Sequence, residues 1–205
     1  MRILVIEAAT AACSVALLDG GALVDARHEV VGRGHAERLV PMIGELLGDD
    51  RPDAILVDCG PGSFTGVRVG LAAARALAFG WQVPVHGYST LALLAATALA
   101  ADSARTAVTI AVTGGHGEVF VQRFTGPALT AIGETRSLIP ADAAQLAGDD
   151  PVFGSGAPVV LSARGDADGL ECLPVAADAI LLPPAFTNLP ATPLYGRAPD
   201  AKLPS

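Results

Sequence analysis

The chain has 205 residues, of which 51% are apolar and 17% are charged. This length and composition predict one compact domain or two small ones, and exclude a disordered chain. The formal net charge is −8 and Lys202 is the single lysine, so the sequence lacks the basic patch with which proteins neutralise nucleic-acid phosphates directly. If this chain acts on a nucleic acid, a partner has to hold that nucleic acid.

The first half reads as strands and helices in a defined order. Asp19-Gly20-Gly21 predicts a hairpin turn between two of the strands, and Ser89 is the expected N-cap of the last helix. Periodicity and turn residues predict strands over 2–7, 13–18, 22–30, 53–58 and 83–87, and helices over 35–47, 63–79 and 90–101.

The second half repeats the order of the first. Strands are expected over 106–113, 117–124, 128–135 and 151–157, with a short helix over 140–148. We interpret the chain as two α/β units, 1–101 and 106–205, each of the β-β-β-α-β-α type found in the actin and sugar-kinase (ribonuclease H-like) superfamily. The second unit is shortened, because no long amphipathic helix follows Gly156. Proteins of that superfamily bind a nucleotide between the two units.

The cysteines and the apolar runs indicate in which compartment the protein is found. The number of cysteines is odd (Cys13, Cys59 and Cys172) and no C-x-x-C pair occurs, so neither a disulfide framework nor a zinc site is expected. No apolar run reaches the roughly 20 residues of a membrane span without a breaker or a charge, and Glu7 interrupts the N-terminal run. We expect a cytoplasmic protein that does not bind a membrane.

The stretch "VDCGPGSFTGVRVGLAAARALAFGW" (57–81) is rich in glycine before and within a predicted helix. A P-loop requires a lysine after the glycines, and none follows here. The dinucleotide fingerprint G-x-G-x-x-G fits Gly60 and Gly62 but fails at Thr65. The stretch is therefore not a phosphate-binding loop of either kind.

Gly62, Gly66 and Gly70 are spaced by four residues and form one stripe on the predicted helix. Each helical glycine costs about 1 kcal/mol relative to alanine, so the stripe indicates that another backbone approaches closely. The helix is apolar nearly all round and has to be buried on more than one side. Its second neighbour is either the chain's own 90–101 helix or another subunit, and we favour the subunit.

Four segments have a pattern that identifies a family. They are "ILVIEAATAACSVALLDGG", "GHAERLVPMIGELL", "DCGPGSFTGVRVGLAAARALAFGWQVPVHGYSTLALLA" and the terminal "PLYGRAPDAK". Together they resemble the bacterial TsaB family of tRNA threonylcarbamoyladenosine biosynthesis proteins. The resemblance covers most of residues 1–100, parts of 110–157 and the C-terminus, and G-P-G-S-F-T-G-x-R-x-G is its most specific segment.

The resemblance implies a scaffold subunit without activity of its own. Such a subunit pairs with the catalytic paralogue TsaD and the ATPase TsaE in transferring a threonylcarbamoyl group to N6 of an adenosine beside the tRNA anticodon. In the family, tRNA and any ATP or ADP enter only in the complex. The unpaired apolar helical face leaves open whether the chain alone is a monomer or a dimer with a second copy. In the family the helices matching 35–47 and 63–79 form a bundle with the partner, which places at the interface His35, Leu39, Ile43, Gly62, Phe64, Gly66, Val67, Gly70, Leu71 and Ala74.

The chain departs from its family where nucleotide chemistry would occur. The first strand of the family usually ends D-T-S-T, and here it ends Glu7-Ala8-Ala9-Thr10, which leaves Glu7 and Thr10 as weak candidates for a cofactor contact. TsaD binds a metal through H-x-x-x-H, and here His86 is followed by Thr90, so no metal is expected.

Two enzyme classes remain as alternatives. A small-molecule kinase would have Glu7 as its acidic residue. A peptidase-like hydrolase would use a nucleophile near the glycine turn, but no histidine lies in a recognisable partner motif.

Overall fold

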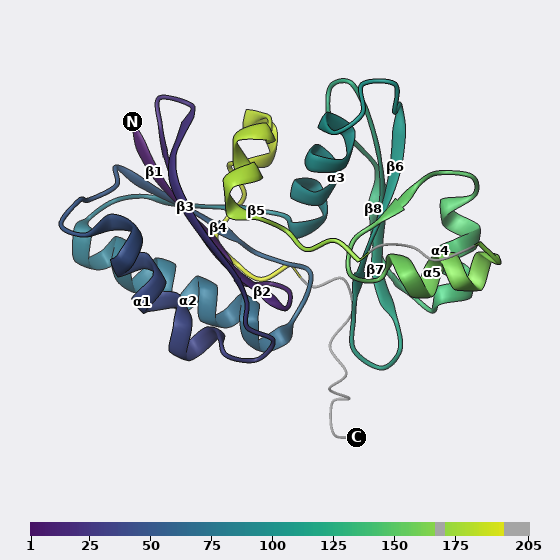
Figure 1. The fold of residues 1–205 in the computed structure, drawn as a ribbon, viewed down its shortest axis with the longest axis horizontal. Helices are drawn as coiled ribbons and strands as arrows, with labels where there is room; N and C mark the ends of the chain where they lie inside the picture. Colours follow the sequence, from purple (N-terminus) through teal and green to yellow (C-terminus); the bar gives the residue numbers. More distant parts are fainter. Residues whose placement is uncertain (167–170, 195–205) are drawn as a thin grey trace, which may run out of the picture.

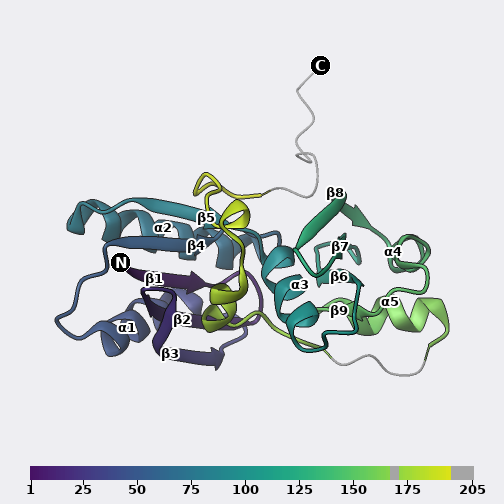
Figure 2. The same ribbon diagram turned by 90° about the horizontal axis from the view of Figure 1, so that it is seen from above.

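A computed structural model describes residues 1–166 and 171–194 and shows two sheets side by side (Figures 1 and 2). The first sheet has the strand order β3-β2-β1-β4-β5, with β4 and β5 parallel to β1. Its strands are β1 (Arg2–Glu7), β2 (Ala12–Asp19), β3 (Ala22–Val30), β4 (Ala54–Asp58) and β5 (Val85–Tyr88). Helices α1 (His35–Leu47) and α2 (Phe64–Trp81) cover one face of it (Figure 1).

The second sheet repeats this order with one strand fewer. Its order is β8-β7-β6-β9, and β9 is parallel to β6 as β4 is to β1. The strands are β6 (Ala107–Thr113), β7 (Val119–Thr125), β8 (Thr130–Leu138) and β9 (Val152–Phe153), with helices α4 (Pro140–Ala147) and α5 (Ala157–Arg164). The internal duplication is thereby confirmed, and its second copy ends in a helix of only 8 residues.

The two copies also share one turn. In the first copy the backbone N–H of Ser63 donates to the carbonyl oxygen of Ala9 at 2.6 Å. In the second, the N–H of Gly156 donates to the carbonyl oxygen of Ala111 at 2.9 Å. In each copy the loop before the helix passes close to the backbone of the first strand of that copy, or of the turn after this strand. A side chain would collide with that backbone at Gly62 and at Gly154, so both positions require glycine.

Helix α3 (Thr90–Ala100) lies between the two sheets and is buried on all sides (Figures 1 and 2). It packs on β6 and β7, and its apolar side chains join a core that also contains Val5, Leu56 and Tyr88 of the first sheet. Ser89 precedes the helix as predicted, but its side chain makes no capping hydrogen bond. The helix is held by apolar packing instead.

The chain returns to the first half after α5. The 3-10 turns η1 (Ala176–Leu181) and η2 (Pro184–Phe186) follow, and η1 packs on α3, β2 and β3. Gly87 and Leu189 then exchange two backbone hydrogen bonds, of 2.7 and 3.0 Å, and the N–H of Leu194 donates to Cys59 O. We call residues 187–194 the return segment. These residues, which were expected in the second unit with the rest of 106–205, therefore contact the first half.

The element bounds agree closely with those expected from the sequence. The main additions are α5, η1 and η2, and the strand expected over 151–157 shrinks to Val152–Phe153. The family-like segment 193–202 lies outside the described residues from position 195 onwards. Within residues 1–166 and 171–194, no helix combines the length and the apolar character needed to span a bilayer.

Candidate subunit interface and the adjoining cavity

The glycine stripe of α2 faces the chain's own first sheet. A side chain at Gly66 would collide with the carbonyl oxygen of Ala8, and one at Gly62 with that of Ala9. Gly70 has more room, since a Cβ there would lie 3.5 Å from the Cβ of Ala8. The expected close approach of a backbone is confirmed, but that backbone belongs to the turn after β1 and not to a partner.

Most of the other residues expected at the interface are buried as well. His35 is held by a contact of 2.9 Å between its Nε2 and the carbonyl oxygen of Ala12. The apolar core between the sheet and the two helices takes up Leu39, Ile43, Val67, Leu71 and Ala74. These side chains are unavailable to a partner while the fold is intact, so their assignment to a subunit interface needs correction.

Phe64 is the exception, and it identifies the outer face of α2. Its ring is 70% exposed, and Phe79 near the other end of the helix is 89% exposed. Between them on this face lie two small residues, Ala72 and Ala76, and two long, flexible ones, Arg68 and Arg75. Arg68 lies over the Phe64 ring at 3.3 Å from its centroid. Val40 of the neighbouring α1 is 55% exposed. Phe79 was not named among the interface residues expected from the sequence. Its position on the side of the helix away from the glycine stripe was the available signal.

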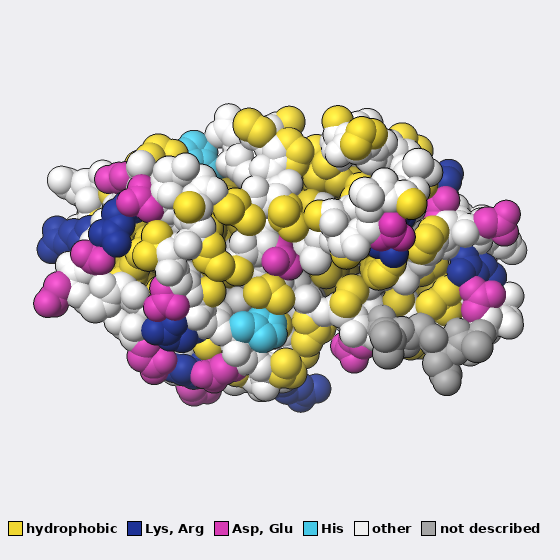
Figure 3. Space-filling model, turned by 45° about the horizontal axis from the view of Figure 1, so that its top comes forward, with side chains coloured by type: hydrophobic (Ala, Val, Ile, Leu, Met, Phe, Trp, Pro, Cys, Tyr) yellow, Lys and Arg dark blue, Asp and Glu magenta, His cyan; other side chains and the backbone are white. Residues whose placement is uncertain are grey.

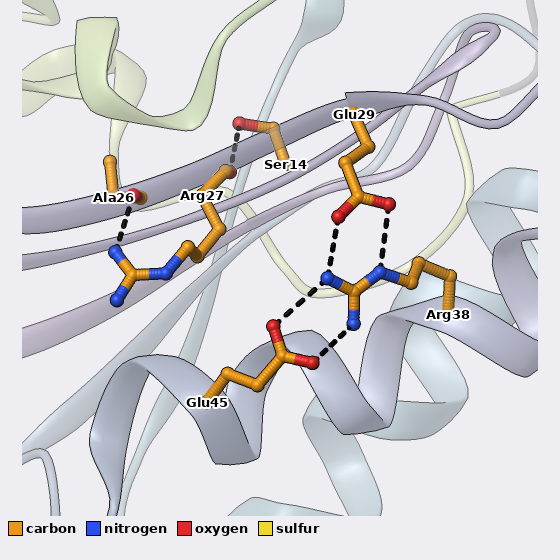
Figure 4. A network of polar contacts seen from close by, with 6 residues as sticks. All are labelled: Ser14, Ala26, Arg27, Glu29, Arg38 and Glu45. Carbon is orange, nitrogen blue, oxygen red and sulfur yellow. Dashed lines mark hydrogen bonds and ion pairs between the residues drawn. The ribbon is translucent and has the colours of Figure 1, made fainter.

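Helix α1 is fastened to the edge strand β3 by one arginine (Figure 4). The Arg38 guanidinium donates to both carboxylate oxygens of Glu29 on β3, at 2.8 and 2.5 Å. It also donates to both oxygens of Glu45 on its own helix, at 2.7 and 2.9 Å. The arginine lowers the pKa of both carboxyl groups because its hydrogen bonds favour their ionised forms. The position of α1 beside α2 is fixed by this network and by the core.

The amino end of α2 is fixed by a capping serine. Ser63 is the N-cap, and its hydroxyl accepts from the N–H of Gly66 at 3.2 Å. At the side of α2, the Arg75 guanidinium donates to the carbonyl oxygen of Ala191 at 2.6 Å. The return segment is thus attached to α2 as well as to β5.

A cavity of about 310 Å³ opens between the two halves beside this amino end. Its polar lining combines Thr10, Ser63, Thr113 and Ser155 with one charge of each sign, from Arg33 and Glu171. The Thr113 N–H and hydroxyl are both bonded to Ser155. Thr10, one of the two candidates for a cofactor contact, lines this cavity, whereas Glu7 does not.

Glu7 does not line the cavity and is completely buried. Its Oε1 accepts from the N–H of Ala9 at 2.8 Å and its Oε2 from the hydroxyl of Tyr88 at 3.1 Å. Both oxygens are therefore occupied by groups of the same chain, and Glu7 does not reach a ligand in the cavity.

The cysteine of the glycine turn, Cys59, is not a reactive nucleophile. Burial raises the pKa of the Cys59 thiol to about 12, and nearby Asp58 adds to the rise. Only a thiolate attacks readily, and this thiol stays protonated at neutral pH. Among the described residues, no cluster of three or more His, Cys, Asp or Glu side chains could hold a metal ion.

Comparisons with known proteins agree with this fold. A family model described as tRNA N6-adenosine threonylcarbamoyltransferase, TsaD, matches residues 27–148. The tRNA threonylcarbamoyladenosine biosynthesis protein TsaB of Escherichia coli is 43% identical over 125 residues, which are 58% of this chain and 53% of that protein. The Haemophilus influenzae TsaB is 41% identical over 113 residues, 53% of this chain and 48% of that protein. This chain spans about half the length of these curated relatives.

Solved structures match over nearly the whole length. A Pseudomonas aeruginosa protein described as similar to peptidase YEAZ has a TM-score of 0.79 and 30% identity, covering 96% of this chain and 99% of that one. YeaZ from Pseudomonas aeruginosa has a TM-score of 0.78 and 29% identity, covering 95% and 99%. The duplicated fold is therefore shared from end to end with these two structures.

Proposed function

Since this chain belongs to the TsaB–TsaD family, as a TsaB-like protein of tRNA threonylcarbamoyladenosine biosynthesis, we propose that it acts there as a non-catalytic subunit paired with a TsaD-type transferase. The observation that carries the proposal is the outer face of α2. Two phenylalanines, Phe64 and Phe79, stand in solvent on the side of the helix opposite its own sheet.

Exposed aromatic side chains separated by small residues favour helix packing against a partner. Ala72 and Ala76 leave a shallow strip between Phe64 and Phe79, into which side chains of another helix can fit. Aromatic residues are enriched at the centres of protein interfaces and supply much of their binding energy. Val40 and Pro41 of α1 are exposed beside this strip and extend the proposed surface to both helices. We call this surface the α1–α2 outer face.

The buried acid and thiol support a subunit without chemistry of its own. Glu7, which a kinase-like enzyme would use, has both oxygens bonded internally, and the Cys59 thiol has a pKa of about 12. These two facts disfavour the small-molecule kinase and the peptidase-like hydrolase. The transferase chemistry is then assigned to the TsaD-type partner.

The charge of the molecule supports indirect contact with tRNA. On the face seen in Figure 3, charged side chains of both signs gather toward the two ends, and apolar and neutral ones cover the middle. With a net charge of −8, the chain is unsuited to hold the tRNA backbone by itself. We therefore propose that tRNA, a TsaE-type ATPase and any ATP or ADP meet this chain only in the complex, in the cytoplasm.

Reconstitution tests the proposal. The purified chain alone should show no ATPase, peptidase or tRNA-modifying activity. Mixed with the TsaD-type protein of the same organism, it should co-elute as a heterodimer and raise threonylcarbamoyl transfer above that of the partner alone. In the absence of that partner, a second copy of the chain is expected at the same face. Turnover by the chain alone, or no association with the partner, would contradict the proposal.

A further inference from the structure

Two carboxyl groups meet inside the first half, at the carboxyl ends of adjacent strands. Glu7 ends β1 and Asp58 ends β4, and these strands are parallel, with Ile6 opposite Val57. Glu7 is 0% exposed and Asp58 is 2% exposed. Glu7 and Asp58 directly follow Ile6 and Val57 in the same register, so their side chains occupy neighbouring positions on one face of the sheet. A hydrogen bond between two carboxyl groups requires a proton on one of them.

The other donors around the pair favour a negative charge on Asp58. The Gly60 N–H donates to Asp58 Oδ1 at 2.5 Å, and the Thr90 hydroxyl lies 2.9 Å from each Asp58 oxygen. Glu7 receives the N–H of Ala9, but its second donor, the Tyr88 hydroxyl, has one proton and lies equally near the carbonyl oxygen of Ile6, at 3.2 Å. Asp58 is therefore the better-solvated anion, and Glu7 is the better acid.

No cation compensates a second negative charge. Among the described residues, no ion pair includes Glu7 or Asp58. The strands alongside contribute Tyr88 and Cys59, whose pKa values burial also raises.

The remaining groups around the pair add no positive charge in contact with it. On β2, Ser14 lies opposite Glu7 and accepts from the N–H of Ala176. Asp178 of η1 accepts from Thr97 of α3. Among the described residues, His86 of β5 forms neither a hydrogen bond nor an ion pair with either carboxyl group. Two adjacent buried carboxylates without a cation repel each other strongly, so only one of them ionises.

We propose that Glu7 and Asp58 share one proton at neutral pH, with Glu7 as the acid that donates to Asp58, and that this shared proton holds the turn after β1 against the loop that leads into α2. Ala9 bonds to Glu7 and Gly60 bonds to Asp58, so the pair joins the two loops directly. The turn after β1 is also what Gly62 and Gly66 of α2 rest on. The pair lies on the face of the first sheet opposite α1 and α2, because the alternating neighbours Ile6 and Val57 face those helices.

The direction of the pKa changes agrees with this geometry. Burial, followed by the neighbouring Asp58, holds the pKa of Glu7 well above its usual range, and burial raises the pKa of Asp58 to about 6. Both values exceed those of the unfolded chain, so the folded state binds more protons. The stabilisation is complete below the ordinary carboxyl pKa and is lost as the pH rises toward the pKa of the folded pair.

Urea unfolding at several pH values tests the shared proton. Between about pH 6 and pH 7 the folding equilibrium constant of the wild-type chain should fall relative to that of Glu7→Gln, by about tenfold per pH unit for one proton. Glutamine keeps the shape and the donor without needing the proton. Glu134→Gln, at an exposed position of β8, is the matched control and should leave the pH dependence unchanged. Parallel pH profiles of wild type and Glu7→Gln would overturn the proposal.

A second measurement needs only the wild-type chain, so it holds even if Glu7→Gln fails to fold. Carboxyl ¹³C chemical shifts of Glu- and Asp-labelled protein should show one protonated side chain at neutral pH, in the folded protein only. Raising the pH should remove that proton and lower the hydrogen-exchange protection of the Ala9 and Gly60 amides together. If every Glu and Asp carboxyl is ionised at neutral pH, Glu7 and Asp58 hold no common proton and the proposal is wrong.

Discussion

Gly66 in α2 rests on the carbonyl oxygen of Ala8, in the turn after β1, with no room for a side chain between them. It is the tightest glycine contact of α2, because a Cβ at Gly70 would be in ordinary contact at 3.5 Å and one at Gly80 would meet nothing within 4 Å. The contact separates the inner side of α2, which is part of the fold, from the outer side, which is free to bind.

Gly66→Ala should destabilise the protein although alanine is the better helix former. The new methyl group has to push α2 away from Ala8, and overpacking of this kind costs about 1–3 kcal/mol, more than the ~1 kcal/mol that helix propensity returns. Gly70→Ala is the matched control, since its Cβ would be in ordinary contact at 3.5 Å. Urea unfolding of both variants checks the difference. Equal stability of the two variants would show that α2 moves freely on the sheet.

Phe79→Asp should abolish association with the TsaD-type partner and leave folding intact. The ring is 89% exposed in the free chain, so its loss removes no core contact, whereas a charge in the middle of an apolar interface is strongly unfavourable. Association is measured by titration calorimetry, and a loss of at least about 2 kcal/mol is expected. Val159→Asp on α5, 48% exposed, is the control and should bind as the wild type does. Undiminished binding by Phe79→Asp would exclude the outer face of α2.

Tyr88→Phe should lower the free energy of unfolding by about 1 kcal/mol, the typical net value of one buried hydrogen bond. The lost hydroxyl serves Ile6 and Glu7, both on β1. The ring itself remains in the core, so no cavity forms. Thermal unfolding measures the change. A loss comparable to that of a core truncation would instead indicate that Glu7 depends on Tyr88 for its position.

Cys13 and Cys59 should be inert to alkylation in the folded protein. Burial raises the pKa of the Cys13 thiol to about 11 and that of Cys59 to about 12, so neither is a thiolate at pH 8. Labelling with iodoacetamide followed by mass spectrometry should modify both only after urea is added. Rapid labelling of Cys59 without urea would revive the nucleophile that a hydrolase requires.

Arg38→Lys should loosen α1 at its contact with β3. Lysine cannot form the two bidentate pairs that the guanidinium makes with Glu29 and Glu45. The network lies at the surface, so the decrease in melting temperature should be smaller than for Gly66→Ala and should shrink further as salt is added. An equal melting temperature of Arg38→Lys and wild type at low salt would show that the core alone positions α1.

The order of elements could be predicted from the sequence, because the signals are local. Alternation and apolar runs are typical of strands, and the helix over 35–47 has the same bounds in the structure. The duplication followed from the repeat of that order. The short fragment β9 and the helix α5 could not be bounded, because Gly154 and Gly156 interrupt the pattern and α5 has only 8 residues.

The candidate site was predicted only in part. The spacing of the glycines shows that one face of the helix has no side chains, but it does not show which segment packs against that face. The stripe of Gly62, Gly66 and Gly70 correctly indicated a close backbone contact, yet whose backbone it is depends on the tertiary fold. A signal for the outer face did exist: Phe64 and Phe79 lie off the stripe. The pairing of Glu7 with Asp58 could also have been suspected, since each acid ends a strand of one parallel pair.

The return segment has a consequence for the order in which the molecule is completed during synthesis. The first half leaves the ribosome first, but the position beside Gly87 that Leu189 fills stays vacant until residue 189 has been made. The face of β2 and β3 that η1 covers stays open until residues 176–181 have been made. A nascent chain stalled before residue 176 would therefore present an unfinished sheet, because the first half is completed by residues that are made long after its own last strand.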